Sequence, residues 1–279
     1  MTKWETIEVE RVGRVSVIRF NRPEKLNAFN DTMTAEFRLA IEEANGDPDI
    51  GAIVSTGNGR AYSAGADVGG FNATFEQGQQ KNQPRPRRPS AFEPQFLMES
   101  KPIIGAINGI AVGMAMTGPL LFDTLLASTE ARFSMRFAAI GLTPEIGSSW
   151  MLPRVIGLHN AREMMLTGRI YSAVECQEFG LVRRLYEPDE LVSAAVELAG
   201  EIAANPISTL ATIKRLIWDD VAATDVASIW RKSSETFARA RTTTEHREAL
   251  LALKDKRSAR FHDNDYMAEL AERIAKGAS

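Results

Sequence analysis

The 279-residue sequence contains a single cysteine, only three histidines and no long apolar run. Cys176 has no partner for an internal disulfide, which is typical of a protein from a reducing compartment. The histidines are scattered along the chain, so they predict no metal site. No stretch approaches the roughly 20 apolar residues of a membrane-spanning helix, and the N-terminus lacks a signal-peptide pattern. We therefore expect a cytoplasmic protein that is not bound to a membrane.

The sequence also lacks an excess of either charge, because the formal net charge is only −3. This balance gives no argument for a nucleic-acid partner. What is present is an ordinary globular composition, 44% hydrophobic, with ample length to bury a core.

Residues 7–10 and 15–20 alternate apolar and polar around Gly13, which predicts a hairpin. Helical spacing predicts a helix over residues 31–45, capped by Asp31 or Thr32, and another over residues 114–126, in which Gly118 and Pro119 imply a kink or an early break. Strand-like runs alternate with helical periodicity up to Pro188, and the pattern is helical from there almost to the end. The sequence thus predicts an α/β fold, with residues 1–200 as its core and residues 201–279 as a C-terminal helical region.

Two glycine-containing stretches each follow a strand-like run and precede a helix. The first is residues 57–67 and the second is residues 101–117. Small residues let a ligand approach the backbone closely, and a helix start leaves amide N–H groups without partners. Two such turns side by side form an oxyanion hole, which stabilises negative charge on a carbonyl oxygen. The alternative is that both are structural helix starts without a ligand.

Glu145 could bring a carboxylate to the same place. The order Thr143-Pro144-Glu145 is also typical of a helix start, with Thr as N-cap, Pro in the first position and an acid in the first turn. Spacing alone favours that structural interpretation. A carboxylate that faces an apolar pocket would have a raised pKa, which suits a base. The apolar candidates for such a pocket are Met114, Met135, Phe137 and Trp150.

Residues 71–94 are polar and rich in proline, with a basic run at Arg85, Arg87 and Arg88. This composition predicts a surface loop, either a lid over the site or an insertion without a role. The arginines either attract phosphate groups or are simply solvated.

Four motifs, in order and with matching spacing, resemble those of the crotonase superfamily, which includes enoyl-CoA hydratases and isomerases. They lie in residues 21–28, 61–67, 101–113 and 166–182. The resemblance covers nearly the whole chain and implies a spiral of ββα units, with C-terminal helices used in trimer assembly and trimers that pair into hexamers. It also implies an acyl-CoA thioester as substrate, with no cofactor because CoA is part of the substrate.

By position, the resemblance implies that the amides of Ala66 and Met114 hold the thioester oxygen. Many relatives have glycine where this chain has Met114, and a backbone donor survives that change. The residues implied to contact CoA or substrate are Lys25, Ala28, Ala64, Asp67, Val68, Phe137, Trp150 and Phe261, the last against the adenine. The structural alternatives are a solvated Lys25 and a Phe261 that only packs between helices.

The reaction follows from which carboxylates remain. Hydratases of this superfamily use two glutamates around one water, and their positions fall on Thr117 and Phe137 here. Residues 144–150 resemble the loop of the isomerases, in which one glutamate is the acid and base. The resemblance therefore implies an enoyl-CoA isomerase with Glu145 as its catalytic group. Two alternatives stay open: Glu145 activates water for hydration or thioester hydrolysis, or the chain only binds acyl-CoA.

Overall fold

The computed structural model describes residues 3–67 and 90–276. The chain forms two compact units, residues 1–200 and 201–279, which we describe separately. The first unit holds every described strand. The expected mixture of strands and helices is confirmed, with the C-terminal region helical.

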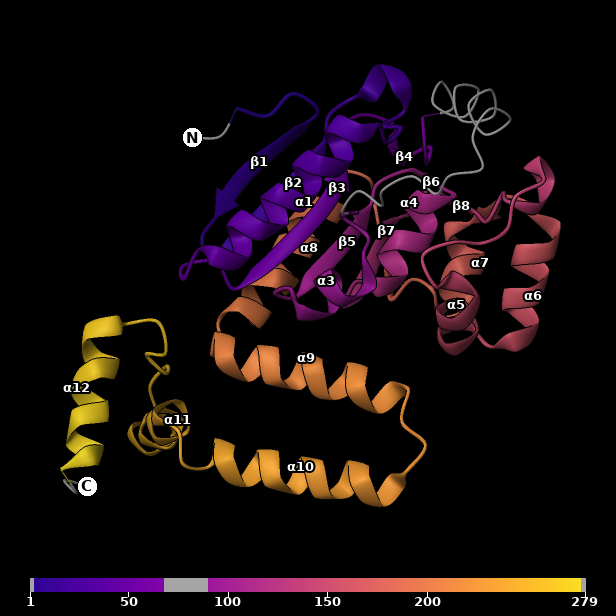
Figure 1. Ribbon diagram of the computed structural model, residues 1–279. Coiled ribbons are helices and arrows are strands. Elements are labelled where there is room, and N and C mark those ends of the chain that lie inside the picture. The colour runs from indigo at the N-terminus through magenta and orange to yellow at the C-terminus, as the bar shows by residue number, and fades with distance from the viewer. Residues whose placement is uncertain (1–2, 68–89, 277–279) are drawn as a thin grey trace, which may run out of the picture. The chain divides into compact units, whose positions relative to one another are not determined.

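One sheet of six strands runs through the first unit (Figure 1). Its edge is a hairpin of β1 (Ile7–Val12) and β2 (Val15–Phe20), which turns at Gly13 as predicted. The strands that follow in the sheet are all parallel: β3 (Ala52–Gly57), β5 (Ile103–Ile107), β7 (Thr124–Ser128) and β10 (Arg184–Tyr186). β3 and β5 are buried along their whole length, as expected for parallel strands covered on both faces.

A second, four-stranded sheet takes the alternate strands. Its order is β4 (Ala61–Ser63), β6 (Ile110–Val112), β8 (Arg132–Ser134) and β9 (Tyr171–Ser172), and only the last pair is antiparallel. Three times in succession, a strand of the large sheet is followed directly by a strand of the small sheet. The chain therefore winds as a spiral in which each turn contributes one strand to each sheet.

Helices complete each turn of the spiral. α1 (Asp31–Gly46) joins β2 to β3, and Asn30 caps it, one residue before the predicted caps. The remaining helices of this part are η1 (Pro23–Lys25), α3 (Pro94–Glu99), α4 (Met114–Thr117), η2 (Gly118–Leu121), η3 (Ala138–Ile140), α5 (Ser148–Ile156), α6 (Leu158–Thr167), α7 (Ala173–Glu178) and α8 (Leu191–Ala203).

The helix expected from Met114 to Leu126 breaks early, at the expected Gly118-Pro119 pair. α4 ends at Thr117 and η2 follows. Pro119 has no N–H to continue an α-helix. Glycine at 118 leaves room for the Phe92 ring, because a Cβ there would lie 2.2 Å from it. The expected range is wrong beyond Leu121, because residues from Thr124 belong to strand β7.

Most of the predicted loop at residues 71–94 lies outside the described residues. Its last part does not fit an exposed loop, since Ala91 and Phe92 are buried. The Phe92 ring contacts the rings of Phe29 and Phe37 at centroid distances of 5.3 and 5.6 Å. The apolar residues before α3 thus belong to the core.

The second unit is helical throughout its described part. It contains α9 (Ile207–Val221), α10 (Val226–Ala240), α11 (Thr244–Asp255) and α12 (Asn264–Ala275). Within this unit, α9 contacts α10, and α11 contacts α12. Trp230 and Phe237 on α10 are 76% and 68% exposed, so this helix has an apolar face open to solvent.

Candidate active site

The structure brings the two glycine turns into direct contact. We define the first glycine turn as residues 63–67, after β4, and the second as residues 112–114, between β6 and α4. A Cβ on Gly65 would lie 2.6 Å from the Val112 carbonyl oxygen and 3.9 Å from the Gly113 Cα. Gly65 also has φ +93°, which disfavours other residues. Only glycine at position 65 allows this close approach.

Both turns present an amide N–H at the expected position. Met114 is the first residue of α4, so its N–H has no intrahelical acceptor. Ala66 lies opposite Phe29 in an isolated β-bridge. The hydrogen bonds of this bridge come from its neighbours, because Phe29 N–H donates to Gly65 O and Asp67 N–H donates to Phe29 O. Among backbone groups in residues 3–67 and 90–276, none accepts from the Ala66 or Met114 amide. Two unused donors therefore lie on adjoining turns.

The loop of residues 22–29 is fastened along the first glycine turn. Ala64 N–H donates to Leu26 O at 2.9 Å, and Phe29 N–H donates to Gly65 O at 2.7 Å. The Asn27 side chain is buried and donates to the carbonyls of Asn58 and Ala61. Leu26 and Asn27 both have positive φ, at 50° and 54°. The hydrogen bonds hold this strained loop in one shape.

The predicted CoA contacts divide between described and undescribed parts of the chain. Lys25 is exposed at the end of η1, and Ala28 is buried beside it. Arg22, which sequence reasoning missed, donates to Ala28 O and forms an ion pair with Asp67 at 3.1 Å. Val68 lies outside the described residues. Phe261 belongs to the second unit.

The two positions where hydratases of the superfamily carry glutamate are both buried. Thr117 is fully buried, and its Oγ1 is an unpartnered buried side-chain polar atom in the described structure. Phe137 is 6% exposed, and a Cβ on Gly113 would lie 4.0 Å from its Cζ. Apolar and neutral groups therefore adjoin the second glycine turn.

The structure contradicts the helix start at Thr143-Pro144-Glu145. α5 begins only at Ser148, and Gly147 precedes it with φ 67°. Glu145 therefore lies in the loop before the helix, with Ile146 in the left-handed region at φ 55°. A β-branched residue rarely adopts that conformation. Spacing could not reveal this turn, because Thr-Pro-Glu is equally typical of the first turn of a helix.

Glu145 is exposed, and its carboxylate makes no hydrogen bond or ion pair with the described residues. Desolvation by the surrounding protein nevertheless raises its pKa above the ordinary value of 4.5. Glu145 is thus an accessible acid with a raised affinity for a proton.

Trp150 follows the Glu145 loop on the first turn of α5. It is half-buried, and the Arg154 guanidinium stacks 4.2 Å from the centre of its ring. This contact covers one part of the indole. The substrate contact that we predict for Trp150 stays a prediction.

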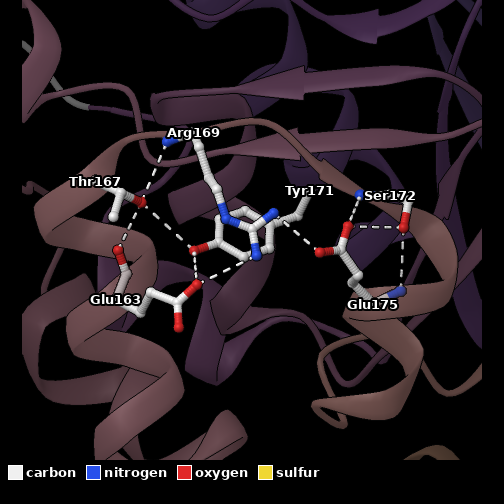
Figure 2. A network of polar contacts seen from close by, with 6 residues as sticks. All are labelled: Glu163, Thr167, Arg169, Tyr171, Ser172 and Glu175. Atoms are coloured by element: carbon white, nitrogen blue, oxygen red, sulfur yellow. Dashed lines mark hydrogen bonds and ion pairs between the residues drawn. The ribbon is translucent and has the colours of Figure 1, made fainter.

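A network of polar contacts joins α6, β9 and α7, after the Glu145 loop in the sequence (Figure 2). Arg169 bonds to Glu175 at 2.9 Å and Glu163 at 3.2 Å, and its guanidinium stacks 3.6 Å from the Tyr171 ring centre. Ser172 and Glu175 form a capping box that begins α7. These contacts hold together the ends of α6, β9 and α7.

Gly168, next to Arg169 in the chain, contacts the end of β8 and the residues that follow it. Gly168 O accepts a hydrogen bond from Ser134 Oγ at 3.0 Å, and a Cβ on Gly168 would lie 3.4 Å from Arg136 Cα. Beyond Arg136, Phe137 O accepts from Leu142 N–H at 2.9 Å and closes the loop before Glu145. The Arg169 network thus adjoins a segment that contacts the end of β8 and the residue before Phe137.

The family model for enoyl-CoA hydratase/isomerase matches residues 10–264. The chain belongs to the enoyl-CoA hydratase/isomerase family. The predicted membership of the crotonase superfamily is thereby confirmed, and the family name implies an acyl-CoA substrate.

Curated family members share about a third of their residues with this chain. A probable enoyl-CoA hydratase of Rhizobium meliloti is 31% identical over 267 residues, which cover 92% of this chain and 98% of that protein. The 1,2-epoxyphenylacetyl-CoA isomerase of Escherichia coli is also 31% identical, over 88% of this chain and 94% of its own. Hydratase and isomerase names thus occur at the same level of identity.

Solved structures agree with the fold. The enoyl-CoA hydratase of Bacillus anthracis has a TM-score of 0.83 at 26% identity and covers 92% of this chain and 99% of its own. Within residues 3–67 and 90–276 of the present chain, no helix is long and apolar enough to cross a membrane.

Proposed function

We propose that this protein is an enoyl-CoA isomerase and that Glu145 is its catalytic acid and base. The carboxylate removes a proton from C2 of a 3-enoyl thioester, and the electron pair delocalises into a dienolate. The same carboxyl group then returns the proton to C4. The double bond moves from C3–C4 to C2–C3, and no atom is gained or lost.

The observation that carries this proposal is the state of Glu145. Its carboxylate is accessible and outside the helix, and desolvation raises its pKa. General-base catalysis favours a carboxylate with a raised pKa. Thr117 and Phe137 cannot supply a second carboxylate at the positions used by hydratases. One acid–base group suffices for a double-bond shift, whereas the hydratase mechanism uses two.

The amides of Ala66 and Met114 would hold the thioester oxygen. Negative charge develops on that oxygen as the dienolate forms, and fixed N–H donors stabilise it. The contact between Gly65 and the Val112–Gly113 backbone supports this role, because the two turns lie against each other. Loss of one such donor typically raises the barrier by about 2.7–4 kcal/mol.

We further propose that CoA lies along the first glycine turn and the loop of residues 22–29. The hydrogen bonds between these two segments provide a continuous, rigid backbone surface. Lys25, exposed at the end of η1, would contact phosphate. The apolar face of α10 at Trp230 and Phe237 supports assembly into trimers or hexamers.

Hydration is the second candidate. The names of several relatives favour it, and the exposed Glu145 carboxylate is accessible to water. In this case Glu145 would activate a water that adds to C3 of a 2-enoyl thioester. Attack of the same water on the thioester carbon would instead release CoA thiol.

Product analysis separates these reactions. The protein and Glu145→Gln would be incubated with a short 3-enoyl-CoA and with a 2-enoyl-CoA, and products followed by mass and ultraviolet absorbance. We expect the 3-enoyl substrate to convert without a change of mass and the variant to be inactive. A water adduct or free thiol would refute the isomerase. Binding without turnover, equal in both proteins, would indicate a binding protein.

A further inference from the structure

The backbone directly after Glu145 adopts a conformation that its sequence disfavours. Ile146 has φ 55° and Gly147 has φ 67°, and α5 begins at the next residue. Glycine adopts this region freely, but for other L-residues it costs about 1–2 kcal/mol. Ile146 therefore carries strain that continuing the helix back to Thr143 would relieve. Strained backbone persists only where its surroundings hold it in place.

Ser148 stabilises this turn with two hydrogen bonds. Its N–H and its Oγ both donate to the Glu145 carbonyl oxygen, at 3.0 and 2.7 Å. The Ser148 side chain is 1% exposed, so its hydroxyl has no access to water as an alternative partner. Gly147 O in turn accepts from the N–H groups of Trp150 and Met151, each at 3.0 Å. The turn is thus closed on both sides of Ile146.

The strained turn changes the environment of the Glu145 carboxylate. In the helix start that the sequence favours, this side chain would lie in the first turn of α5. The positive end of the helix dipole would stabilise its anion and weaken it as a base. Because Ile146 and Gly147 are left-handed, α5 begins only at Ser148, and Glu145 stays in the preceding loop.

We propose that Ile146 and Ser148 are positioning residues of the reaction, because the turn they form holds Glu145 outside α5 in a fixed orientation for proton transfer. This inference rests on the proposed role of Glu145. It assigns a purpose to the backbone strain at Ile146. The two residues act through Glu145 and need not touch the substrate.

Two substitutions at position 146 separate backbone conformation from side chain. Ile146→Pro fixes φ near −65° and forbids the turn, whereas Ile146→Asn removes the same side chain but tolerates φ near +55°. We expect Ile146→Pro to lower kcat about 100-fold, the loss typical of a 1 Å misplacement, with KM unchanged. With proline as the first helical residue, Glu145 becomes the N-cap beside the positive end of the helix dipole, so the acid limb of the pH–kcat profile should move to lower pH. Ile146→Asn should keep the kcat and pH profile of the wild type.

Ser148 gives an independent pair if Ile146→Pro does not fold. Ser148→Ala removes the hydroxyl and should lower kcat, and Ser148→Thr restores the hydroxyl and should recover it. Wild-type kcat and pH profile in folded Ile146→Pro, or in Ser148→Ala, would overturn the positioning role. Full activity of Glu145→Gln would instead refute the proposed function, so the two failures are distinguishable.

Discussion

Gly65→Ala tests whether the contact between the glycine turns creates the catalytic site. The added Cβ would lie 2.6 Å from Val112 O, which is 0.8 Å closer than the 3.4 Å at which ordinary contact begins. Both atoms belong to backbone, so neither can rotate away. Alanine would also have to adopt φ +93°. The two turns must therefore separate or distort.

The expected effect on catalysis follows from that displacement. A shift of about 1 Å in a reacting geometry can cost 100-fold in rate, and loss of one oxyanion donor costs about 100- to 1,000-fold. We expect Gly65→Ala to lower kcat about 100-fold, with a smaller effect on KM. The left-handed backbone would also destabilise the fold by about 1–2 kcal/mol.

Gly13→Ala is the matched control. Gly13 has φ +59°, but nothing lies within 4 Å of its Cβ position, and it belongs to the β1–β2 hairpin. This variant should lose similar stability without losing activity. The assay is steady-state turnover of 3-enoyl-CoA, with urea unfolding of both variants. Wild-type kcat in folded Gly65→Ala would refute the reasoning.

Three further predictions concern titration and buried polar groups. Thr117→Val should stabilise the protein in urea unfolding by about 1–3 kcal/mol, because it removes an unpartnered buried hydroxyl; destabilisation would indicate a hidden partner. The Arg257 guanidinium lowers the pKa of buried Glu248 to about 2, so Glu248→Gln should destabilise the protein at pH 7 by about 1.5–3 kcal/mol. That difference should shrink as pH falls from about 4.5 towards 2, where Glu248 protonates, and a pH-independent difference would contradict it. Finally, kcat/KM should fall as pH falls through the raised pKa of Glu145, with a midpoint above 4.5, and a lower midpoint would contradict this.

Local signals were sufficient for much of the fold. The β1–β2 hairpin follows from alternating residues around Gly13, and α1 from the helical spacing of Met33, Phe37 and Ile41. Both glycine turns could be located because small residues interrupt apolar strands. The family resemblance implied that amides from both turns hold one oxygen, but the contact between Gly65 and Val112 depends on strand pairing between distant segments.

The errors arose where local and tertiary preferences differ. Residues from Thr124 have an apolar composition that fits a helix, but strand pairing with Ile104 and its neighbours places them in the sheet. Thr143-Pro144-Glu145 has every local feature of a helix start, yet the left-handed Ile146 delays the helix to Ser148. Local sequence does not contain the contacts that decide either case.

Other features of the site have no local signal. Arg22 bonds to Ala28 and Asp67 only because residues 22–29 lie along the first glycine turn. Ser148 resembles any helix-start serine, and its bond to Glu145 O becomes visible only in the structure. A resemblance carries over the positions of catalytic groups but not the residues that hold them in this chain.

The most direct test of the central claim is the reaction of 3-enoyl-CoA in heavy-oxygen water, followed by mass spectrometry of the acyl product. If Glu145 only transfers a proton between C2 and C4, the wild type will give a 2-enoyl product without heavy oxygen. Glu145→Gln will then give no product. Heavy oxygen in the first-formed product would show that water is a reactant and would contradict the isomerase account.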